Sequence, residues 1–143
     1  YEPVMLTDQL CCQAKEAGSF LASIAKTHCK SGKKLAYIAG GETVVNITGH
    51  GKGGRNQEIA LSAAEGIKGM SNAAVFSIGS GPTDAAGGYS DGDTAGVLKN
   101  KGIDIFEVLK NNDAYNALKL TEGLIITGPT GTNVNDVSVL LIG

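Results

Sequence analysis

The sequence predicts an α/β fold, with a layered, mostly parallel or mixed sheet flanked by helices. Short apolar segments of strand length alternate with segments that carry apolar residues at helical spacing. The best strand candidates, AAVFSIG and VSVLLIG, are nearly continuous apolar runs, which are typical of buried strands in a parallel sheet. Glycine supplies 21 of the 143 residues and gathers in loops between these segments. A chain of this length can bury a core, so we expect one domain, residues 1–143.

The N-terminal part of the chain predicts one helix and then two strands. The segment from Thr7 to Cys29 has helical spacing, with Thr7 or Asp8 as the expected N-cap and Gly32 beyond its end. KLAYIAGGE and TVVNITG are typical of two short strands, which form a hairpin or lie side by side. The apolar positions of the expected helix are Leu10, Ala14, Ala17, Phe20, Leu21 and Ile24.

The rest of the chain continues the alternation. NQEIALSAAEGI predicts a second helix, AAVFSIG a buried strand, and SGPTDAAGGYSDGDT a long glycine loop. AGVLKNKG predicts a short helix, and EVLKNNDAYNALKL one or two further helical turns with Asp113 as a candidate cap. GLIITG predicts a strand, PTGTNVND a loop and VSVLLIG a final strand. Since all three glycine loops follow strands, they are expected to meet along one rim of the sheet.

Composition excludes several classes of protein. The net charge is −2 and the isoelectric point is about 5.6, and no basic run indicates a nucleic-acid partner. The longest apolar runs have strand length, so no membrane span is expected. Three cysteines, Cys11, Cys12 and Cys29, have neither a disulfide pattern nor zinc-ligand spacing. We expect idle thiols in a reducing cytoplasm, with a reactive thiol as the alternative. The chain begins with tyrosine and no signal-peptide pattern follows, which favours a piece of a longer protein.

The first glycine loop, GHGKGGRNQE, contains Arg55, the only arginine of the chain. The loop leads into a helix, whose unpaired N–H groups and positive dipole end favour an anion. The guanidinium fork suits a phosphate or carboxylate, Lys52 and His50 add charge, and Asn56 is a suitable cap. We therefore expect an anion site, with a surface turn carrying solvated cations as the alternative. Arg55 locked against a carboxylate of its own domain, together with neighbouring amides turned away from any cavity, would contradict this site.

Two nucleotide motifs were compared with this loop. A P-loop is excluded, because Gly54 is followed by Arg-Asn rather than Lys-Ser or Lys-Thr. The dinucleotide pattern G-x-G-x-x-G is matched by Gly49, Gly51 and Gly54. However, no acidic residue ends the next strand, as a ribose-binding position would require. Binding of a nicotinamide nucleotide is therefore a weak alternative.

The second and third loops carry oxygen and amide groups. Asp91 and Asp93 in the second loop lack the remainder of a calcium-loop pattern and are expected to hold turn structure. Asp84 could anchor a neighbouring loop or cap a short helix, or it could be a residue of the functional site; both interpretations stay open. The third loop offers hydroxyl and amide groups that suit a polyhydroxy acid or a phosphate, with a self-satisfied polar loop as the alternative. These groups belong to Thr127, Thr130, Thr132, Asn133 and Asn135.

Three motifs in order, GKGGRNQE, GPTDAAGG and TGPTGTNVNDV, resemble those of the MOFRL domain. This is the C-terminal domain of the type II glycerate 2-kinases, many of which are labelled hydroxypyruvate reductases. AGGETVV and NNDAYNAL also fit, so the resemblance extends from about Lys34 onward. Here FSIGS runs directly into Gly81, whereas the family usually has extra residues there, including a Thr-Asp-Gly stretch.

The resemblance implies a kinase that transfers the γ-phosphoryl group of ATP to D-glycerate, giving 2-phosphoglycerate, with Mg2+. The active site would lie in a cleft between a Rossmann-like N-terminal domain, which brings a lysine, and this domain. Arg55 would be the catalytic or substrate-orienting residue. Two alternatives stay open: a small-anion-binding or protein-interaction module without catalysis, and an NAD(P)-dependent hydroxypyruvate reductase. The oligomeric state also stays open. The expected substrate-binding residues are Lys52, Gly53, Gly54, Asn56, Asp84, Thr130, Thr132 and Asn133.

Overall fold

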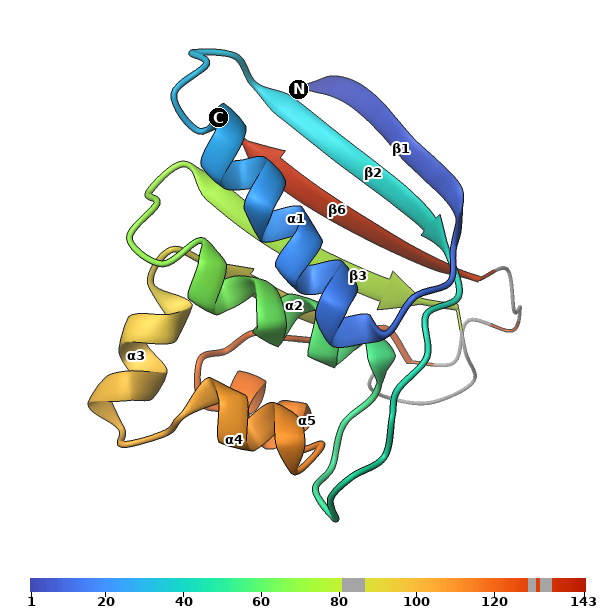
Figure 1. Cartoon of the computed structure of the whole chain (residues 1–143), viewed down its shortest axis with the longest axis vertical. Coiled ribbons are helices and arrows are strands. Elements are labelled where there is room, and N and C mark those ends of the chain that lie inside the picture. The colour runs from blue at the N-terminus through green and yellow to red at the C-terminus, as the bar shows by residue number, and fades with distance from the viewer. Residues whose placement is uncertain (81–86, 129–130, 132–134) are drawn as a thin grey trace.

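The structure is a computed structural model that describes residues 1–80, 87–128, 131 and 135–143. In this part of the chain six strands form one sheet in the order β1-β2-β6-β3-β4-β5 (Figure 1). β1 and β2 are parallel, and each of the other neighbouring pairs is antiparallel. The strands are β1 Glu2–Leu10, β2 Leu35–Gly41, β3 Ala73–Gly79, β4 Gly87–Asp91, β5 Leu124–Ile125 and β6 Asp136–Ile142.

The sheet is therefore mixed, which is one of the two expected forms, and the mostly parallel form is wrong. The last strand, β6, lies between β2 and β3 and runs antiparallel to both. β2 and β3 are still parallel to each other, as the helix between them predicts. The apolar runs of β3 and β6 thus reflect their central place in the sheet rather than a parallel partner.

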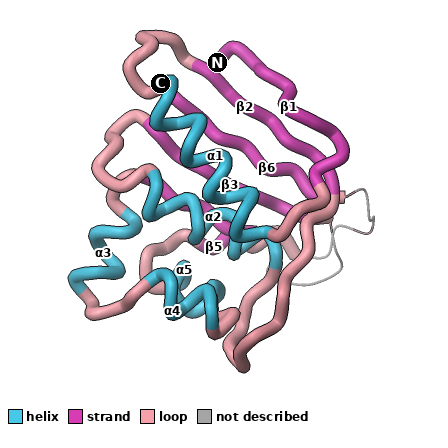
Figure 2. Tube along the Cα trace, in the orientation of Figure 1, coloured by secondary structure: helices cyan, strands magenta, loops and turns pink. Residues whose placement is uncertain are grey.

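The two longest helices cover one face of the sheet (Figures 1 and 2). α1 and the sheet enclose one core with one side of α2, around Leu21, Ile59 and Leu140. The opposite side of α2 packs on the three short helices through a second core that includes Leu61 and Leu118. Because α2 lies between two cores, its polar side chains near the N-terminus are also buried. The helices are α1 Ala14–His28, α2 Arg55–Gly66, α3 Thr94–Asn100, α4 Ile105–Lys110 and α5 Ala114–Lys119.

Small residues set the distance between α1 and α2. A Cβ atom at Gly18 would overlap the carbonyl oxygen of Ile59, and one at Gly66 would lie 2.5 Å from the Cβ of Ala22. The two helices therefore approach each other where glycine and alanine meet, and α2 is fixed against the sheet. Among the described residues, no helix is both long and apolar enough to cross a membrane.

The expected N-terminal helix boundary is wrong. Residues 2–10 form an edge strand on β2, so Thr7 and Asp8 are not caps and Leu10 ends a strand. The helix begins only at Ala14, and Phe20 lies on its outer side with 56% exposure. Residues 2–10 form a strand because they can pair with the free edge of β2, and this pairing outweighs the weak helical spacing of their apolar residues.

Three other expected segments differ from the structure, and the remaining helices and strands are confirmed. TVVNITG is not a strand, since Val44 forms only an isolated bridge with Gln13. The end of the predicted second loop, Gly87–Asp91, forms β4, and GLIITG is shortened to a two-residue strand. Asp113 occupies the N-cap position of α5, but its carboxylate bonds to the N–H of Lys52 and to Asn116 instead of to the helix backbone.

Candidate functional site

The N-terminus of α2 lies at one end of the central strands. Asp136, the first residue of β6, pairs with Gly41 at the end of β2 and with Gly79 at the end of β3. A Cβ atom at Gly79 would lie 2.6 Å from Asp136 Oδ1 and 2.8 Å from Asn56 Nδ2. The strand ends and the first turn of α2 therefore converge on Asp136, where Arg55 also lies.

Arg55 is held by two carboxylates of its own chain. Its Nε donates to Asp136 Oδ2, its Nη2 donates to Asp136 Oδ1 at 3.2 Å, and its Nη1 lies 3.1 Å from Glu42 Oε1. This meets the first of the two conditions that together would contradict the anion site. The hydrogen bond with Asp136 raises the pKa of Arg55 further, although burial alone would lower that pKa. The side chain is 35% exposed, so part of the guanidinium still faces solvent.

The two carboxylates differ in burial. The Asp136 side chain is only 6% exposed, whereas that of Glu42 is 56% exposed. A solvated ion pair of this kind contributes about 0–1 kcal/mol, because water and salt screen it. Removing one partner of a buried, hydrogen-bonded pair costs about 3–5 kcal/mol. Asp136 is therefore the group that fixes Arg55, and Glu42 can be displaced at low cost.

A buried polar network supports this end of α2. Asn56 is the second residue of the helix rather than its cap, and Gly54 occupies the N-cap position. The hydroxyl of Ser77 donates to Asn56 Oδ1 at 2.5 Å, and its oxygen lies 2.7 Å from that of Ser138. The capping role expected for Asn56 is therefore wrong, because its amide ties the helix to the sheet.

The first half of the glycine loop is bound to the turn that precedes α5. Asn112 Oδ1 accepts the N–H groups of Thr48 and Gly49, Asn111 accepts those of His50 and Gly51, and Asp113 accepts that of Lys52. Five consecutive N–H groups are thus satisfied inside the chain. The loop from 48 to 52 is not an anion-binding backbone in this structure.

The glycines of this half have a steric role. A Cβ atom at Gly49 would overlap the backbone of Asn111, and one at Gly51 would lie 2.6 Å from the Cα of Asp113. Nothing but glycine allows the two backbones to approach this closely. In contrast, the nearest atom to a Cβ at Gly54 is 3.5 Å away. Close backbone packing therefore explains the first glycines of the motif, and the dinucleotide pattern at these positions loses its support.

Sequence reasoning did not identify the residue that holds the loop, Asn112. This residue is 8% exposed and adopts φ of 56°, which asparagine tolerates better than most residues. Its Nδ2 donates to the carbonyl of Asn46 and, at 3.0 Å, to the carboxylate of Glu58. The sequence signal was the Asn-Asn-Asp run between two helical segments, which is typical of a turn.

Glu58 is a buried carboxyl group on the first turn of α2, with 3% exposure. Burial raises its pKa, although the hydrogen bond from Asn112 and the charge of Lys15 act in the opposite direction. The side chain points toward the loop support rather than toward Arg55, since its hydrogen-bond partner is Asn112. We therefore place Glu58 in the scaffold of the site.

The other expected site residues have different places. The ammonium of Lys52 lies 3.9 Å above the ring of Tyr115, so this cation packs on α5. Gly53 and Gly54 lead into α2, whose first turn has no side-chain cap among the described residues. His50 is exposed. Four expected residues lie outside the part of the chain that the structure describes: Asp84, Thr130, Thr132 and Asn133.

Asp91 has the turn role expected for it. Its Oδ1 accepts the N–H groups of Asp93 and Thr94 and the Thr94 hydroxyl, and its Oδ2 accepts the hydroxyl of Tyr89. Burial would raise the pKa of Asp91, but these hydrogen bonds lower it further than burial raises it. This carboxylate therefore organises the start of α3.

Besides Asp136, two described polar groups of the third loop form hydrogen bonds, one within the loop and one to the end of β3. The Thr127 hydroxyl donates to the carbonyl of Gly128, and the carbonyl of Asn135 accepts the Ser80 hydroxyl at 3.3 Å. No cluster of three or more metal-ligating side chains occurs in the described ranges. The described carboxylates at the site, Asp136 and Glu42, are both paired with Arg55. The described residues therefore do not form a magnesium site.

Comparisons with known proteins agree in their outcome. A profile of the MOFRL family matches residues 35–136. The chain is 53% identical, over 96% of its length, to the D-glycerate 2-kinase of Thermotoga maritima, and 44% identical, over 99%, to the glycerate 2-kinase of Pyrococcus horikoshii. The crystal structure of glycerate kinase from Thermotoga maritima superposes with a TM-score of 0.95 at 51% identity, over 100% of this chain and 36% of that one. The chain spans about a third of the length of these relatives (35% and 34% of the two kinases).

Proposed function

The chain belongs to the MOFRL family, and from that premise we propose that it is the C-terminal domain of a glycerate 2-kinase-like enzyme. This domain contributes half of an interdomain cleft in which the γ-phosphoryl group of ATP passes to D-glycerate and gives 2-phosphoglycerate. The observation that carries the proposal is the 53% identity with a D-glycerate 2-kinase over nearly the whole chain. The remaining two thirds of such a protein would supply the N-terminal domain.

Arg55 is the catalytic residue that we propose in this domain. A guanidinium has five N–H donors, and Asp136 and Glu42 together engage three of them in the described part of the chain. Two donors remain for an incoming phosphoryl or carboxylate oxygen, and displacement of the exposed Glu42 would release a third. The loose transition state of phosphoryl transfer spreads negative charge over the equatorial oxygens, which a positioned guanidinium stabilises.

The local charge supports a site that is completed from outside this domain. Asp136 and Glu42 contribute two negative charges against one positive charge on Arg55, which leaves a net charge of about −1 before any ligand binds. ATP and glycerate add further negative charge. The balance therefore requires cations from elsewhere, namely magnesium carried by the nucleotide phosphates and the lysine of the N-terminal domain.

Other groups would shape the substrate side of the pocket. The N–H groups from Gly53 to Asn56, at the positive end of the α2 dipole, would assist in binding an anion. Lys52 would contribute through its charge if its ammonium left Tyr115. We keep Asp84, Thr130, Thr132 and Asn133 as proposed substrate-binding residues.

The test is an ATP-dependent assay of glycerate phosphorylation on a two-domain protein. The chain is joined to the N-terminal two thirds of the Thermotoga maritima kinase, or to its own native continuation. Arg55→Ala should lower kcat/KM by about 10²–10³-fold, as the loss of one group that stabilises developing charge does. Arg55→Lys should restore only part of the activity, because an ammonium lacks the fork.

Lys119→Ala, in the last turn of the short helix α5, is the matched control and should leave the activity unchanged. A kcat/KM within threefold of wild type for Arg55→Ala would reject the role of Arg55. An inactive but folded two-domain protein would reject the kinase assignment.

A binding module without catalysis is the second candidate. The observation that favours it is the neutralisation of Arg55 by two carboxylates of the same domain. Isothermal titration with glycerate, 2-phosphoglycerate and ATP distinguishes the two functions. Binding of an acid without nucleotide, together with an inactive two-domain protein, would support the module. NADH titration tests the reductase, for which the glycine loop offers no free backbone from 48 to 52.

We also infer a cytoplasmic location. Cys11, Cys12 and Cys29 are free thiols, as a reducing compartment maintains them. Fractionation of the source cells with an antibody against the chain would test this inference.

A further inference from the structure

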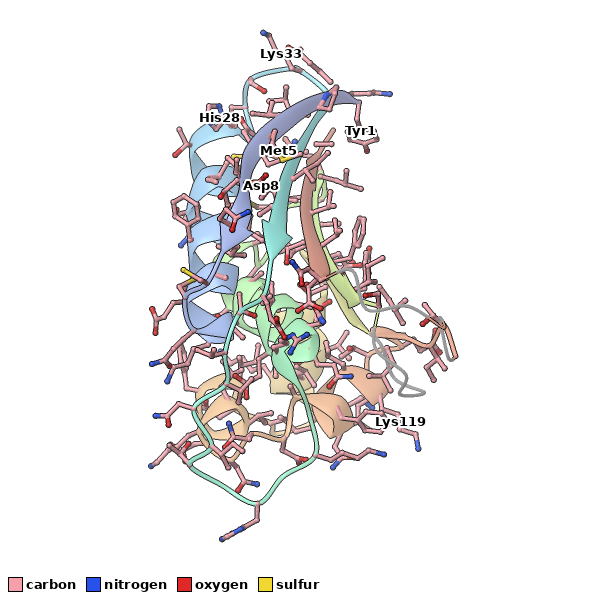
Figure 3. The ribbon with its side chains drawn as sticks, turned by 90° about the vertical axis from the view of Figure 1, so that its right-hand side faces the viewer. Tyr1, Met5, Asp8, His28, Lys33 and Lys119 are labelled. Carbon is pink, nitrogen blue, oxygen red and sulfur yellow. The ribbon has the colours of Figure 1, made fainter. Side chains whose placement is uncertain are left out.

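In the part of the chain that the structure describes, one face of the sheet has no helix over it (Figure 3). Figure 3 views the sheet from its β1 side and shows α1 and α2 on one side of the strands only. Along β2 and β3 the side chains alternate between a buried position toward the helices and a more open position on the other side, and on β6 Val137 and Leu141 are more open, whereas Val139 is 8% exposed. We call this other side the open face. It is formed by Ala36, Ile38, Ala74, Phe76, Ile78, Tyr89, Val137, Val139 and Leu141.

The open face is apolar across four neighbouring strands. The register places Ile38, Val139, Phe76 and Tyr89 in one row, each on a different strand. Next to this row lie Ala36, Leu141 and Ala74 on one side and Val137 and Ile78 on the other. One charged side chain belongs to these rows, because Asp91 of β4 pairs with Ala74 and ends the row of Ala36, Leu141 and Ala74.

Strands with apolar residues on both faces are typical of sheets covered on both faces. A sheet with one face exposed to solvent would instead have strands in which apolar and polar side chains alternate. Here Val137 remains 40% exposed and Tyr89 38% exposed. An uncovered apolar patch spread over several strands marks an interaction site. The pattern therefore points to a partner that supplies a second layer.

We propose that the open face is the docking surface for the N-terminal domain of the same polypeptide. This inference rests on the proposed function. The relatives are about three times as long as this chain, so they contain the polypeptide needed to form the second layer. The rows are apolar apart from Asp91 at one corner, so they fit a partner surface that is itself mainly apolar, such as the packed face of a folded domain.

The open face is continuous with the candidate site. Val137 and Ile78, the last row, directly adjoin Asp136 and Gly79 at the strand ends. A domain that packs on this row reaches the rim where Arg55 is held by Asp136. Docking on the open face would therefore bring the second half of the cleft to Arg55, which a copy packed on a distant surface would not do.

The opposite end of the open face has a hollow that could receive an anchor side chain. The cavity measures about 380 Å3 and includes Ala74, Tyr89 and Leu141 from the open face. Binding energy concentrates where a large side chain enters such a pocket and water is excluded. Its remaining wall includes Tyr1, Met70 and Asn72 and two acidic residues, Asp91 and Asp93.

The experiment is side-chain footprinting of the active two-domain protein, with each residue's labelling rate normalised to its rate in the unfolded protein. Tyr89 and Met5, on and beside the open face, are compared with Phe20 and Phe106 on the outer sides of helices. In this chain Met5 is 66% and Phe106 67% exposed, so equal labelling is expected without a partner. Docking should slow the labelling of Tyr89 and Met5 by about fivefold or more relative to the two phenylalanines.

A variant pair makes the test specific. Phe76→Lys should restore labelling of Tyr89 by undocking the domains, whereas the control Phe106→Lys should leave Tyr89 protected. An active wild-type protein in which Met5 is labelled as fast as Phe106, and Tyr89 only as much more slowly as its 38% exposure predicts, would overturn the docking surface but not the kinase proposal. Protection of Tyr89 in an inactive two-domain protein would support the docking surface and reject the kinase proposal. Protection that disappears on dilution, with a dimer by light scattering, would assign the face to a second copy and also overturn the inference.

Discussion

The two halves of the GHGKGGRNQE segment behave as different structures. Five consecutive backbone N–H groups of residues 48–52 donate to the turn at 111–113, four of them to side-chain oxygens, and the glycines of this half permit close packing. Residues 54–56 begin α2, have space around Gly54, and place Arg55 beside Asp136. One glycine-rich motif thus contains both a structural segment, residues 48–52, and the charged side chain of Arg55. The comparison teaches that glycine density alone does not locate a ligand.

The largest effect is expected from the residue that binds the scaffold half. Asn112→Ala removes the acceptor of two N–H groups and the donor to Glu58, and it places alanine at φ of 56°. Buried groups left without partners cost about 1–3 kcal/mol each, so we expect a loss of about 3–5 kcal/mol in the free energy of unfolding by urea. Asn112→Gly keeps the backbone freedom and should recover about 1 kcal/mol of this loss. Equal stability of wild type and Asn112→Ala would show that the loop does not depend on this side chain.

The second effect separates the two carboxylates at Arg55. Asp136→Asn removes the buried charge that fixes the guanidinium and should cost about 2–4 kcal/mol of stability, less than for a fully buried pair because Arg55 is 35% exposed. Glu42→Gln alters an exposed pair and should cost less than about 1 kcal/mol. Urea unfolding of Asp136→Asn, Glu42→Gln and Arg55→Ala measures how much stability each of the three charged groups contributes. If Glu42→Gln proved the more damaging change, the assignment of Asp136 as the main support would be wrong.

The third effect compares glycines within the motif. Gly49→Ala would bring a methyl group into the backbone of Asn111, and such overpacking costs about 1–3 kcal/mol. Gly54→Ala meets no atom closer than 3.5 Å, and its φ of −159° suits any residue, so its cost should stay below about 1 kcal/mol. Thermal unfolding of the two variants under one buffer condition measures the difference. Similar losses for both would contradict the division of the motif.

The parts of the fold that follow from local pattern were predictable from the sequence. α2 was predicted because Ile59 and Ala63 repeat at helical spacing, and β3 and β6 because each is a short apolar run. The strand β1 and the relative directions of neighbouring strands were not predicted, because both depend on pairing between segments that are distant in the sequence. For example, β6 is the last strand in the sequence, but in the folded sheet it lies between β2 and β3.

The same limit applies to the candidate site. The position of Arg55 at a helix start was predicted, since the loop and the helix are adjacent in sequence. Its partner Asp136 lies 81 residues away, so no local pattern could show that the charge is neutralised. The capping expected of Asn56 failed for a similar reason, because Ser77 lies on a different element. Distant polar partners thus decide what a motif residue can do.

The smallest effect concerns the boundary between the two halves, where Glu58 of α2 meets Asn112 of the loop support. Burial raises the pKa of Glu58, so the folded chain binds this proton more tightly than the unfolded chain does. Its contribution to stability is therefore complete below the ordinary pKa of 4.5 and is lost as pH rises through the raised value. Glu58→Gln keeps an oxygen for Asn112 and has no proton to lose.

The stability of wild type relative to Glu58→Gln should thus fall as pH increases from about 4 to 8, measured by urea unfolding at each pH. Glu65→Gln, an exposed position of the same helix, is the control and should show a nearly constant difference. A wild-type advantage that grows with pH would mean that Glu58 is stabilised as a carboxylate. The hydrogen bond between Asn112 and Glu58 would then be a charge-assisted bond to a carboxylate rather than a bond to a neutral carboxyl group.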